Sequence, residues 1–282
     1  MDRHTVIASA EPLPGPLEAR SLASRVLGEQ AARRVGVLVS LTLSDLRARY
    51  GRGPWQLLKW LSDPFAVVGI YLLLVTFVLD RGGIAPGLSL ACAVVPFQLV
   101  TMAIINGLGA IDLRQSIILN MRFDRTLIPI SSAMTETVAF AASFLLIVLM
   151  MASYQVAPTP AALWLPVVIG VNFFLAVAFA YVGSLIGLWF RDLRAFFLSF
   201  VRALFFLAPG LVPLSLIGGR ANELVKVNPL TGLFEAYRST LLYGHRPAAW
   251  QLLYPAAIAV AMLIALVPVY RREQRQFAKV IG

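Results

Sequence analysis

The sequence predicts an all-α integral membrane protein with six transmembrane helices. Of its 282 residues, 59% are hydrophobic and 13% are charged, whereas ordinary soluble domains are roughly half apolar and about a quarter charged. A soluble fold of this size could not bury that much apolar surface, so lipid should surround most of the chain. Several apolar runs also approach the roughly 20 residues that a helix needs to cross about 30 Å of hydrocarbon.

Residues 1–34 are predicted to form a mobile cytoplasmic tail that precedes a transmembrane domain over residues 35–282. The tail contains Pro12, Pro14, Pro16 and five arginines. It lacks the apolar core of a cleaved signal peptide, so the N-terminus is expected to stay in the cytoplasm.

An amphipathic helix is predicted directly after this tail. Ser40, Ser44 and Arg47 lie off its apolar face. A basic, one-sided helix of this kind is expected to lie along the inner membrane surface. The apolar face consists of Val35, Val39, Leu43, Leu46 and Tyr50.

Six apolar segments are predicted to span the membrane. The fifth contains Arg202 and the run "APGLVP", so it should be broken near Pro209 to Pro213, which a membrane permits only where protein or water covers the freed backbone groups. The six segments are Pro64–Leu79, Leu88–Ala110, Ser131–Ser153, Leu163–Phe190, Phe196–Ile217 and Trp250–Tyr270.

The basic residues fix the predicted orientation. With six spans and a cytoplasmic N-terminus, eighteen Lys and Arg residues fall on inner segments and five on outer segments. This asymmetry follows the positive-inside rule. Both termini are therefore predicted to face the cytoplasm.

A charged, amphipathic stretch, "VNPLTGLFEAYRSTLLYG", lies on the outer side between the last two spans. Asn228 can cap a helix there and Pro229 suits its first position. Glu235 and Arg238 can pair at a spacing of three residues. Such a helix lies in the interface or re-enters the membrane; it is either a loop helix packed on the bundle or a lid at the outer end of a conduit. Its apolar stripe is Leu230, Leu233, Phe234, Tyr237 and Leu241.

The inner segment between the second and third spans is longer than a plain connection. It has about twenty residues where roughly two to eight suffice, and it places Arg122, Asp124 and Arg125 among apolar side chains. It is predicted either to dock a soluble partner through a short helix or to be a solvated loop with internal ion pairs. A shorter loop with Arg191 and Asp192 is a second, smaller candidate contact.

The order of these motifs resembles the membrane subunit of bacterial ABC exporters for cell-surface polysaccharides, a family that includes O-antigen, teichoic acid, capsule and galactan permeases. The resemblance covers Val35 to Gly282, and the stretch "NPLTGLFEAYR" is its most specific part. The other matching motifs are "LSDLRARYGRGPWQLL", "MRFDRTLIPISSAM", "FRDLRAFFLSFVRALFFLAPGLVPLSLI" and "YRREQRQFAKVIG".

The resemblance implies a half-transporter that forms a homodimer and binds two copies of a separate ATPase, which holds ATP and Mg. Its implied cargo is a polysaccharide linked to polyprenyl diphosphate, which is moved outward across the membrane. The excess of arginine over lysine indicates a GC-rich genome, and this favours galactan over teichoic acid as the cargo. By match, the loop Asn120 to Leu127 is the coupling helix, with candidate contacts at Asn120, Met121, Arg122, Phe123, Asp124, Arg125, Arg191 and Asp192. The outer re-entrant helix corresponds to Asn228, Pro229, Phe234, Glu235, Tyr237 and Arg238.

The residues themselves indicate that this chain is not an ATPase. A phosphate-binding loop needs glycines followed by Lys and Ser or Thr, yet the three lysines precede Trp60, Val227 and Val280. We assign no catalytic residue, no metal ligand and no cofactor to the chain. Its one cysteine, Cys92, allows no internal disulfide and is predicted to be an inert core or lipid-facing thiol.

Aromatic residues and one arginine are candidates for lining a conduit, because aromatic faces offer flat apolar contact to sugar rings. Ordinary helix packing explains the same aromatics. Arg202 either meets a diphosphate headgroup near the conduit entrance, snorkels, or pairs with Glu136, since a lone guanidinium in a span is costly. The candidate set is Arg202, Phe65, Tyr71, Phe196, Phe197 and Phe200.

Two other classes of protein remain open. An ion-coupled secondary transporter needs membrane-embedded titratable groups, and Glu136 could carry a proton, although pairing with a nearby arginine, or capping polar contacts near the inner interface, explains it as well. An intramembrane enzyme is less consistent with the sequence, because there is no aspartate-rich metal motif and no HExxH. The two histidines, His4 and His245, lie outside the predicted spans.

Overall fold

The computed structural model of the chain describes residues 16–50, 62, 65–70, 73, 85–121 and 123–274. Across these residues the regular structure is helical throughout, with no β-strand. The predicted all-α class is therefore confirmed. The first helix, α1, covers Pro16–Tyr50, so the second half of the predicted tail is helical and continuous with the predicted amphipathic helix.

Four helices in the described part of the chain are long and apolar enough to cross a membrane. They are α3 (Pro86–Leu113), α5 (Leu127–Ser153), α6 (Leu165–Trp189) together with the 3₁₀ turn η2 (Pro160–Trp164) that leads into it, and α10 (Ala249–Glu273). These helices match the second, third, fourth and sixth predicted spans. The chain is a multi-pass membrane protein.

The first and fifth predicted spans are not among these four helices. The first, Pro64–Leu79, lies mostly outside the described residues. The fifth is not one continuous span, because α7 (Arg194–Leu207) has 14 residues and is about 21 Å long at a rise of about 1.5 Å per residue. The chain then turns at Ala208 to Pro213, which confirms the predicted break.

Short elements connect these helices at the two ends of the bundle. At one end, α4 (Gln115–Asn120) joins α3 to α5, and the 3₁₀ turn η3 (Arg191–Leu193) joins α6 to α7. At the other end, η4 (Leu214–Leu216), α8 (Gly219–Lys226) and α9 (Pro229–Leu241) lie between α7 and α10. We call the α4 end the inner end, following the predicted orientation.

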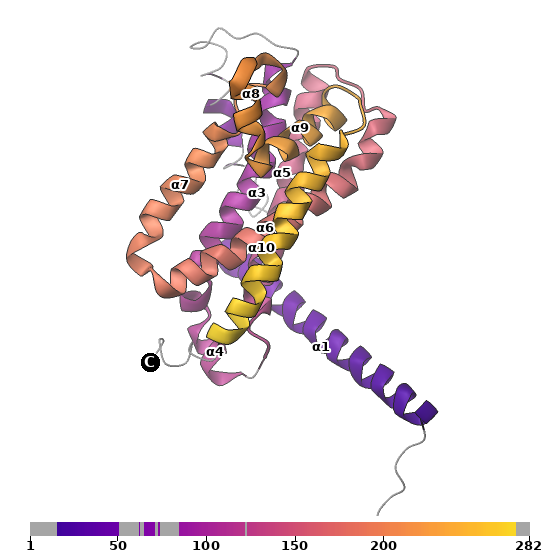
Figure 1. Cartoon of the computed structure of the whole chain (residues 1–282), viewed down its shortest axis with the longest axis vertical. Helices are drawn as coiled ribbons and strands as arrows, with labels where there is room; N and C mark the ends of the chain where they lie inside the picture. Colours follow the sequence, from indigo (N-terminus) through magenta and orange to yellow (C-terminus); the bar gives the residue numbers. More distant parts are fainter. Residues whose placement is uncertain are drawn as a thin grey trace, which may run out of the picture.

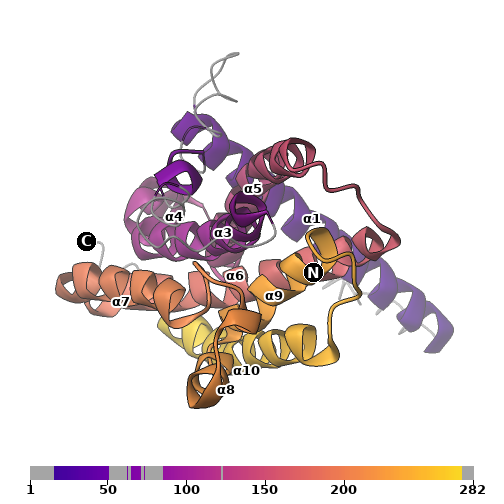
Figure 2. The same ribbon diagram turned by 90° about the horizontal axis from the view of Figure 1, so that it is seen from above.

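Helix α3 is at the centre of the bundle. It packs against α5, α6 and α9, and α10 packs on α6 and α9 (Figures 1 and 2). Helix α7 lies at the periphery, and α1 crosses below the inner end of the bundle and extends past it (Figures 1 and 2). In the most apolar 18-residue stretch of α3, 72% of the residues are buried, whereas in that of α10 only 11% are buried. Helix α3 is therefore an interior helix and α10 is a surface helix.

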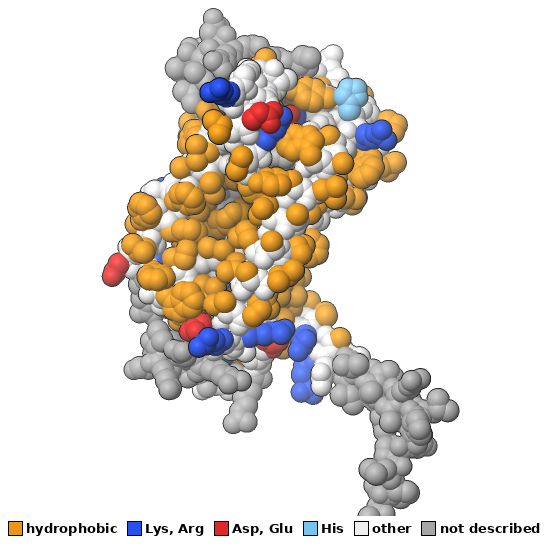
Figure 3. All heavy atoms as spheres, in the orientation of Figure 1, with side chains coloured by type: hydrophobic (Ala, Val, Ile, Leu, Met, Phe, Trp, Pro, Cys, Tyr) orange, Lys and Arg blue, Asp and Glu red, His pale blue; other side chains and the backbone are white. Residues whose placement is uncertain are grey.

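Apolar side chains cover the middle of the molecular surface. Figure 3 shows a hydrophobic belt over α7 and α10, with charged side chains gathered toward the two ends. Phe174 of α6 and Ile264 of α10 belong to the exposed apolar set. An apolar belt between polar ends is the surface expected of a protein surrounded by lipid.

Close packing of α3 against α6 depends on glycine. A Cβ atom added to Gly183 would lie 2.5 Å from the Ile104 carbonyl oxygen, and one added to Gly187 would lie 2.1 Å from that of Leu108. On α3, a Cβ atom added to Gly107 would lie 2.5 Å from the Ala180 carbonyl oxygen of α6. Small residues at such positions let two membrane helices approach closely enough for backbone contact.

Replacing Gly187 with Ala is predicted to lower the free energy of unfolding by about 1–3 kcal/mol, because the added methyl group would force α3 and α6 apart. Gly170→Ala is the matched control on the same helix, since a Cβ there meets nothing within 4 Å; it should be neutral or stabilising by at most about 1 kcal/mol. Unfolding in mixed micelles of rising SDS content measures both. Equal stability of the two variants would contradict this account of the contact.

Candidate functional site

The inner segment between α3 and α5 contains the short helix α4, but not where the resemblance placed one. The helical residues are Gln115–Asn120, whereas Met121 is extended and residues 123–126 are non-helical. The Asp124 carboxylate accepts hydrogen bonds from the Thr126 backbone nitrogen (3.2 Å) and hydroxyl (2.7 Å). This local bonding competes with a helical turn, so the helix that the resemblance implied over Asn120 to Leu127 is not formed by the described residues of that stretch, and α4 ends where it was expected to begin.

Only some of the predicted partner-contact residues point outward. Asn120 and Met121 are exposed, and Phe123 is half-buried. Arg125 donates a hydrogen bond to the Gln274 carbonyl oxygen at the end of α10. Asp192 is exposed, whereas Arg122 and the side chain of Arg191 lie outside the described residues.

A buried arginine that the sequence analysis did not single out anchors this segment. Arg114 follows α3 and is 5% exposed. Its guanidinium forms an ion pair with Asp45 of α1 and donates to the hydroxyls of Ser131 (3.1 Å) and Ser132 (3.4 Å) at the start of α5. Because a buried charge is tolerated only when it is paired and hydrogen-bonded, this cluster fixes α1, α3 and α5 relative to one another.

Helix α1 makes a second ionic contact and carries two depressions. Arg34 lies 3.7 Å from the Asp124 carboxylate. A groove of about 230 Å³ separates this part of α1 from the inner segment; it is lined by Gln30, Arg33, Arg34, Val37, Phe123, Asp124 and Leu127. We call it the α1–loop groove.

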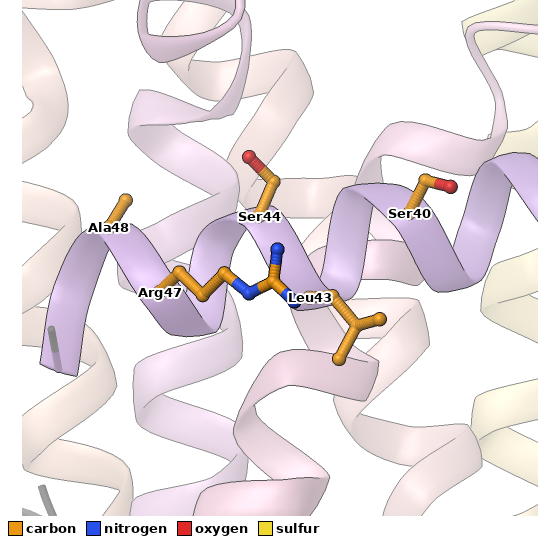
Figure 4. Close-up of a pocket in the computed structure, with 5 residues that line it drawn as sticks. All are labelled: Ser40, Leu43, Ser44, Arg47 and Ala48. Carbon is orange, nitrogen blue, oxygen red and sulfur yellow. The ribbon is translucent and has the colours of Figure 1, made fainter. Parts of the chain in front are cut away.

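The second depression lies on α1 itself and measures about 540 Å³. Its described lining residues all come from α1 (Figure 4): Ser40 and Ser44 point to the same side of the helix, and Arg47 extends along it in the direction of Leu43. On the predicted apolar face, Val35, Val39 and Leu43 are exposed and Leu46 is buried.

Four of the six predicted conduit residues lie on α7. Phe196 and Phe200 are 73% and 51% exposed, and Phe197 stacks on Phe200 with a centroid separation of 6.5 Å. Arg202 is also exposed and forms no ion pair with a described residue. Phe65 is 37% exposed, and Tyr71 lies outside the described residues.

The suggested pairing of Arg202 with Glu136 is wrong. Glu136 is 3% exposed on α5 and accepts a hydrogen bond from the Asn106 side chain of α3. Asn106 of α3 is therefore one partner of this carboxyl group, and no ion pair joins Glu136 to Arg202 among the described residues.

The outer helix α9 begins as predicted. The Asn228 side chain accepts a hydrogen bond from the Leu230 nitrogen (3.0 Å), which caps the helix, and donates to the Leu204 carbonyl oxygen of α7 (2.8 Å). Pro229 occupies the first turn. The cap therefore also ties the start of α9 to the end of α7.

Unlike an amphipathic surface helix, α9 is enclosed. Eleven of its thirteen residues are buried, including Phe234, Glu235, Tyr237 and Arg238, and it packs against α3, α6 and α10. The Tyr237 hydroxyl accepts a hydrogen bond from the Asn172 side chain of α6 (3.4 Å). Glu235 and Arg238, which lie off the predicted apolar stripe, are therefore also inside the protein, as in a loop helix packed on the bundle.

Arg238 organises the break after α7. Its guanidinium is fully buried, pairs with Glu235 at 2.8 Å, and donates to the carbonyl oxygens of Pro209 (2.8 Å) and Gly210 (2.9 Å). It also contacts the carbonyl oxygen and hydroxyl of Ser89 in α3 at 3.2 and 3.1 Å. The predicted pairing at a spacing of three residues is confirmed, and it satisfies backbone groups that the broken helix leaves free.

Sequence comparison gives the same family as the motifs. The chain is 28% identical over 250 residues to the O-antigen export system permease protein RfbA of Myxococcus xanthus, covering 87% of this chain and 95% of the relative. It is 24% identical over 209 residues to the protein of the same name from Klebsiella pneumoniae, covering 74% of this chain and 81% of the relative. No protein-family model matches the chain.

The resemblance to polysaccharide-export permeases is confirmed. The similarity extends over most of the chain. Cys92 is fully buried in α3, which confirms a core thiol. The described residues contain no cluster of three or more His, Cys, Asp or Glu side chains suited to a metal ion.

Replacing Arg238 with Met is predicted to destabilise the permease fold by about 3–5 kcal/mol, because it leaves the buried Glu235 carboxylate without its charged partner. Lys226→Met is the matched control, since the Lys226–Glu223 pair has the same 2.8 Å separation but exposed side chains; the expected loss is under about 1 kcal/mol. Unfolding in mixed micelles measures both variants. A stable Arg238→Met variant would contradict the anchoring role of this cluster.

Proposed function

We propose that the chain is the permease half of an ATP-driven exporter that moves polyprenyl-diphosphate-linked polysaccharide from the cytoplasmic to the outer side of a bacterial inner membrane. The observation that carries this proposal is the similarity over 87% of the chain to a protein named as an O-antigen export permease. The four apolar helices support the membrane location. We favour galactan as the cargo, because the arginine-rich composition indicates a GC-rich genome.

A separate ATPase is the proposed motor, and it holds ATP and Mg. The sequence has no phosphate-binding loop of its own, since none of its lysines is followed by Ser or Thr. The inner segment offers the partner exposed Asn120 and Met121. Both termini of the chain are proposed to lie on this cytoplasmic side.

Two copies of the chain are proposed to form the passage between them. Helix α7 supports this arrangement, because its exposed Phe196, Phe200 and Arg202 lie at the periphery of the bundle. Phe196 and Phe200 would give sugar rings flat, weakly selective contacts, and Arg202 would meet the diphosphate headgroup through charge-assisted hydrogen bonds. At the outer end, α9 would shape the exit.

An ion-coupled transporter is the second candidate. The observation that favours it is the buried Glu136 carboxyl group at its hydrogen bond with Asn106, because transporters of that class use titratable groups inside the membrane. A protonophore that stops export while cellular ATP stays constant would favour this candidate over the ATP-driven exporter.

The ATP-driven exporter predicts a stable complex between this chain and its proposed ATPase partner. The complex should purify with the ATPase, and replacing the phosphate-binding lysine of that ATPase should abolish surface polysaccharide while the complex still assembles. Immunoblotting of purified membranes and of cell-surface polysaccharide measures the two results. Normal surface polysaccharide in cells with the inactive ATPase would contradict the proposal.

Arg202→Ala is predicted to lower the export rate roughly tenfold, since hydrogen bonds to a charged group are lost, and Arg202→Lys should retain part of the rate because it keeps the charge. Export per permease at matched expression measures this effect. Arg220→Ala is the control, because Arg220 is an exposed arginine of α8 at the other end of the bundle. Wild-type rates in both Arg202 variants would remove Arg202 from the proposed passage.

A further inference from the structure

Helix α1 is connected to both ends of the inner segment. Asp45 forms an ion pair with Arg114, which directly precedes α4, and Arg34 lies 3.7 Å from Asp124, which lies three residues before the start of α5. These two contacts are eleven residues apart on one helix. The segment Gln115–Phe123 is thus held at its start and its end by the same rigid element.

The first of these contacts is strong enough to fix the position of α1. The Arg114 side chain is 6% exposed, and hydrogen bonds to Ser131 and Ser132 satisfy it further. Removing one member of such a buried pair typically costs several kcal/mol. A force that moves the inner segment must therefore move α1 as well.

The α1–loop groove lies between these two elements and has a defined chemistry. Val37, Phe123 and Leu127 supply its apolar surface, and Gln30, Arg33 and Arg34 supply a polar rim. The Arg34 charge faces Asp124, whereas Arg33 is exposed and forms no ion pair with any described residue. The rim therefore carries an unbalanced positive charge beside an apolar surface.

We propose that the α1–loop groove is part of the contact with the soluble ATPase, and that it receives a partner segment carrying a carboxylate beside an apolar side chain. The proposal rests on the proposed function, because it requires a soluble partner at the inner end. The argument for this occupant is charge complementarity: a partner carboxylate would balance Arg33, and its apolar neighbour would cover Phe123 and Val37.

The inner segment alone would give the ATPase only a small contact, and the α1–loop groove would enlarge it. Helix α4 has six residues, and the neighbouring Asp124 and Arg125 already bond within the chain. Adding one face of α1 gives the partner two elements that are fixed to each other. Motion of the ATPase would then reach the bundle through α1 and Arg114 as well as through α4.

The test measures the affinity of the purified ATPase for the full chain in nanodiscs of uncharged phosphatidylcholine, by biolayer interferometry. Arg33→Glu is expected to weaken binding roughly tenfold or more, because it places like charges together, and the loss should shrink at high salt. Arg47→Glu is the matched control: Arg47 is also exposed on α1 but does not line the groove, and it should bind within about twofold of wild type.

The other outcomes of this binding experiment separate failure of the groove contact from failure of the proposed function. Wild-type affinity of Arg33→Glu, or an equal loss in Arg47→Glu, overturns the groove contact while the proposed function stands. Sensitivity to Arg33→Glu that occurs only in nanodiscs containing phosphatidylglycerol overturns it in favour of an anionic lipid. Absence of ATPase binding to the wild-type chain contradicts the proposed function itself. Equal unfolding midpoints of the two variants confirm that folding is not the cause.

Discussion

The backbone contact between α3 and α6 is the constraint on which the rest of the structure depends. Helices in a membrane gain little from the hydrophobic effect, so close approach and hydrogen bonding hold them together. Gly183 and Gly187 provide that approach. With α3 fixed inside the bundle, its two ends become rigid attachment points: Ser89 near the outer end bonds to Arg238, and Arg114 at the inner end bonds to Asp45.

Both attachments are buried arginines, and each holds at least one segment that is not part of the four long helices. Arg238 holds the irregular chain after α7 through the Pro209 and Gly210 carbonyl oxygens. Arg114 holds α1 and the start of α5. In each case the cost of burying a charge is offset only if all its partners stay in place. The inner segment and the irregular chain after α7 are therefore positioned by the same central helix.

The elements that could be predicted from the sequence are those with local causes. The second, third, fourth and sixth spans follow from length and hydropathy, and the start of α9 follows from Asn228 and Pro229. The break after α7 follows from the prolines at 209 and 213. What could not be predicted depends on distant partners: Asp45 lies 69 residues before Arg114, and Ser89 lies 149 residues before Arg238. Sequence periodicity places Glu235 and Arg238 off the apolar stripe of α9, but it does not show that they are buried, because it does not show which backbone groups a broken helix leaves free. A serine pair at the start of α5, Ser131 and Ser132, was the available signal for a buried charge nearby.

Export of labelled lipid-linked polysaccharide by purified components in sealed vesicles tests the central claim most directly. The account predicts export only when this chain, its ATPase and hydrolysable ATP are all present, and none when the ATPase is replaced by its inactive variant. Export by this chain alone, without any nucleotide-hydrolysing partner, would contradict it.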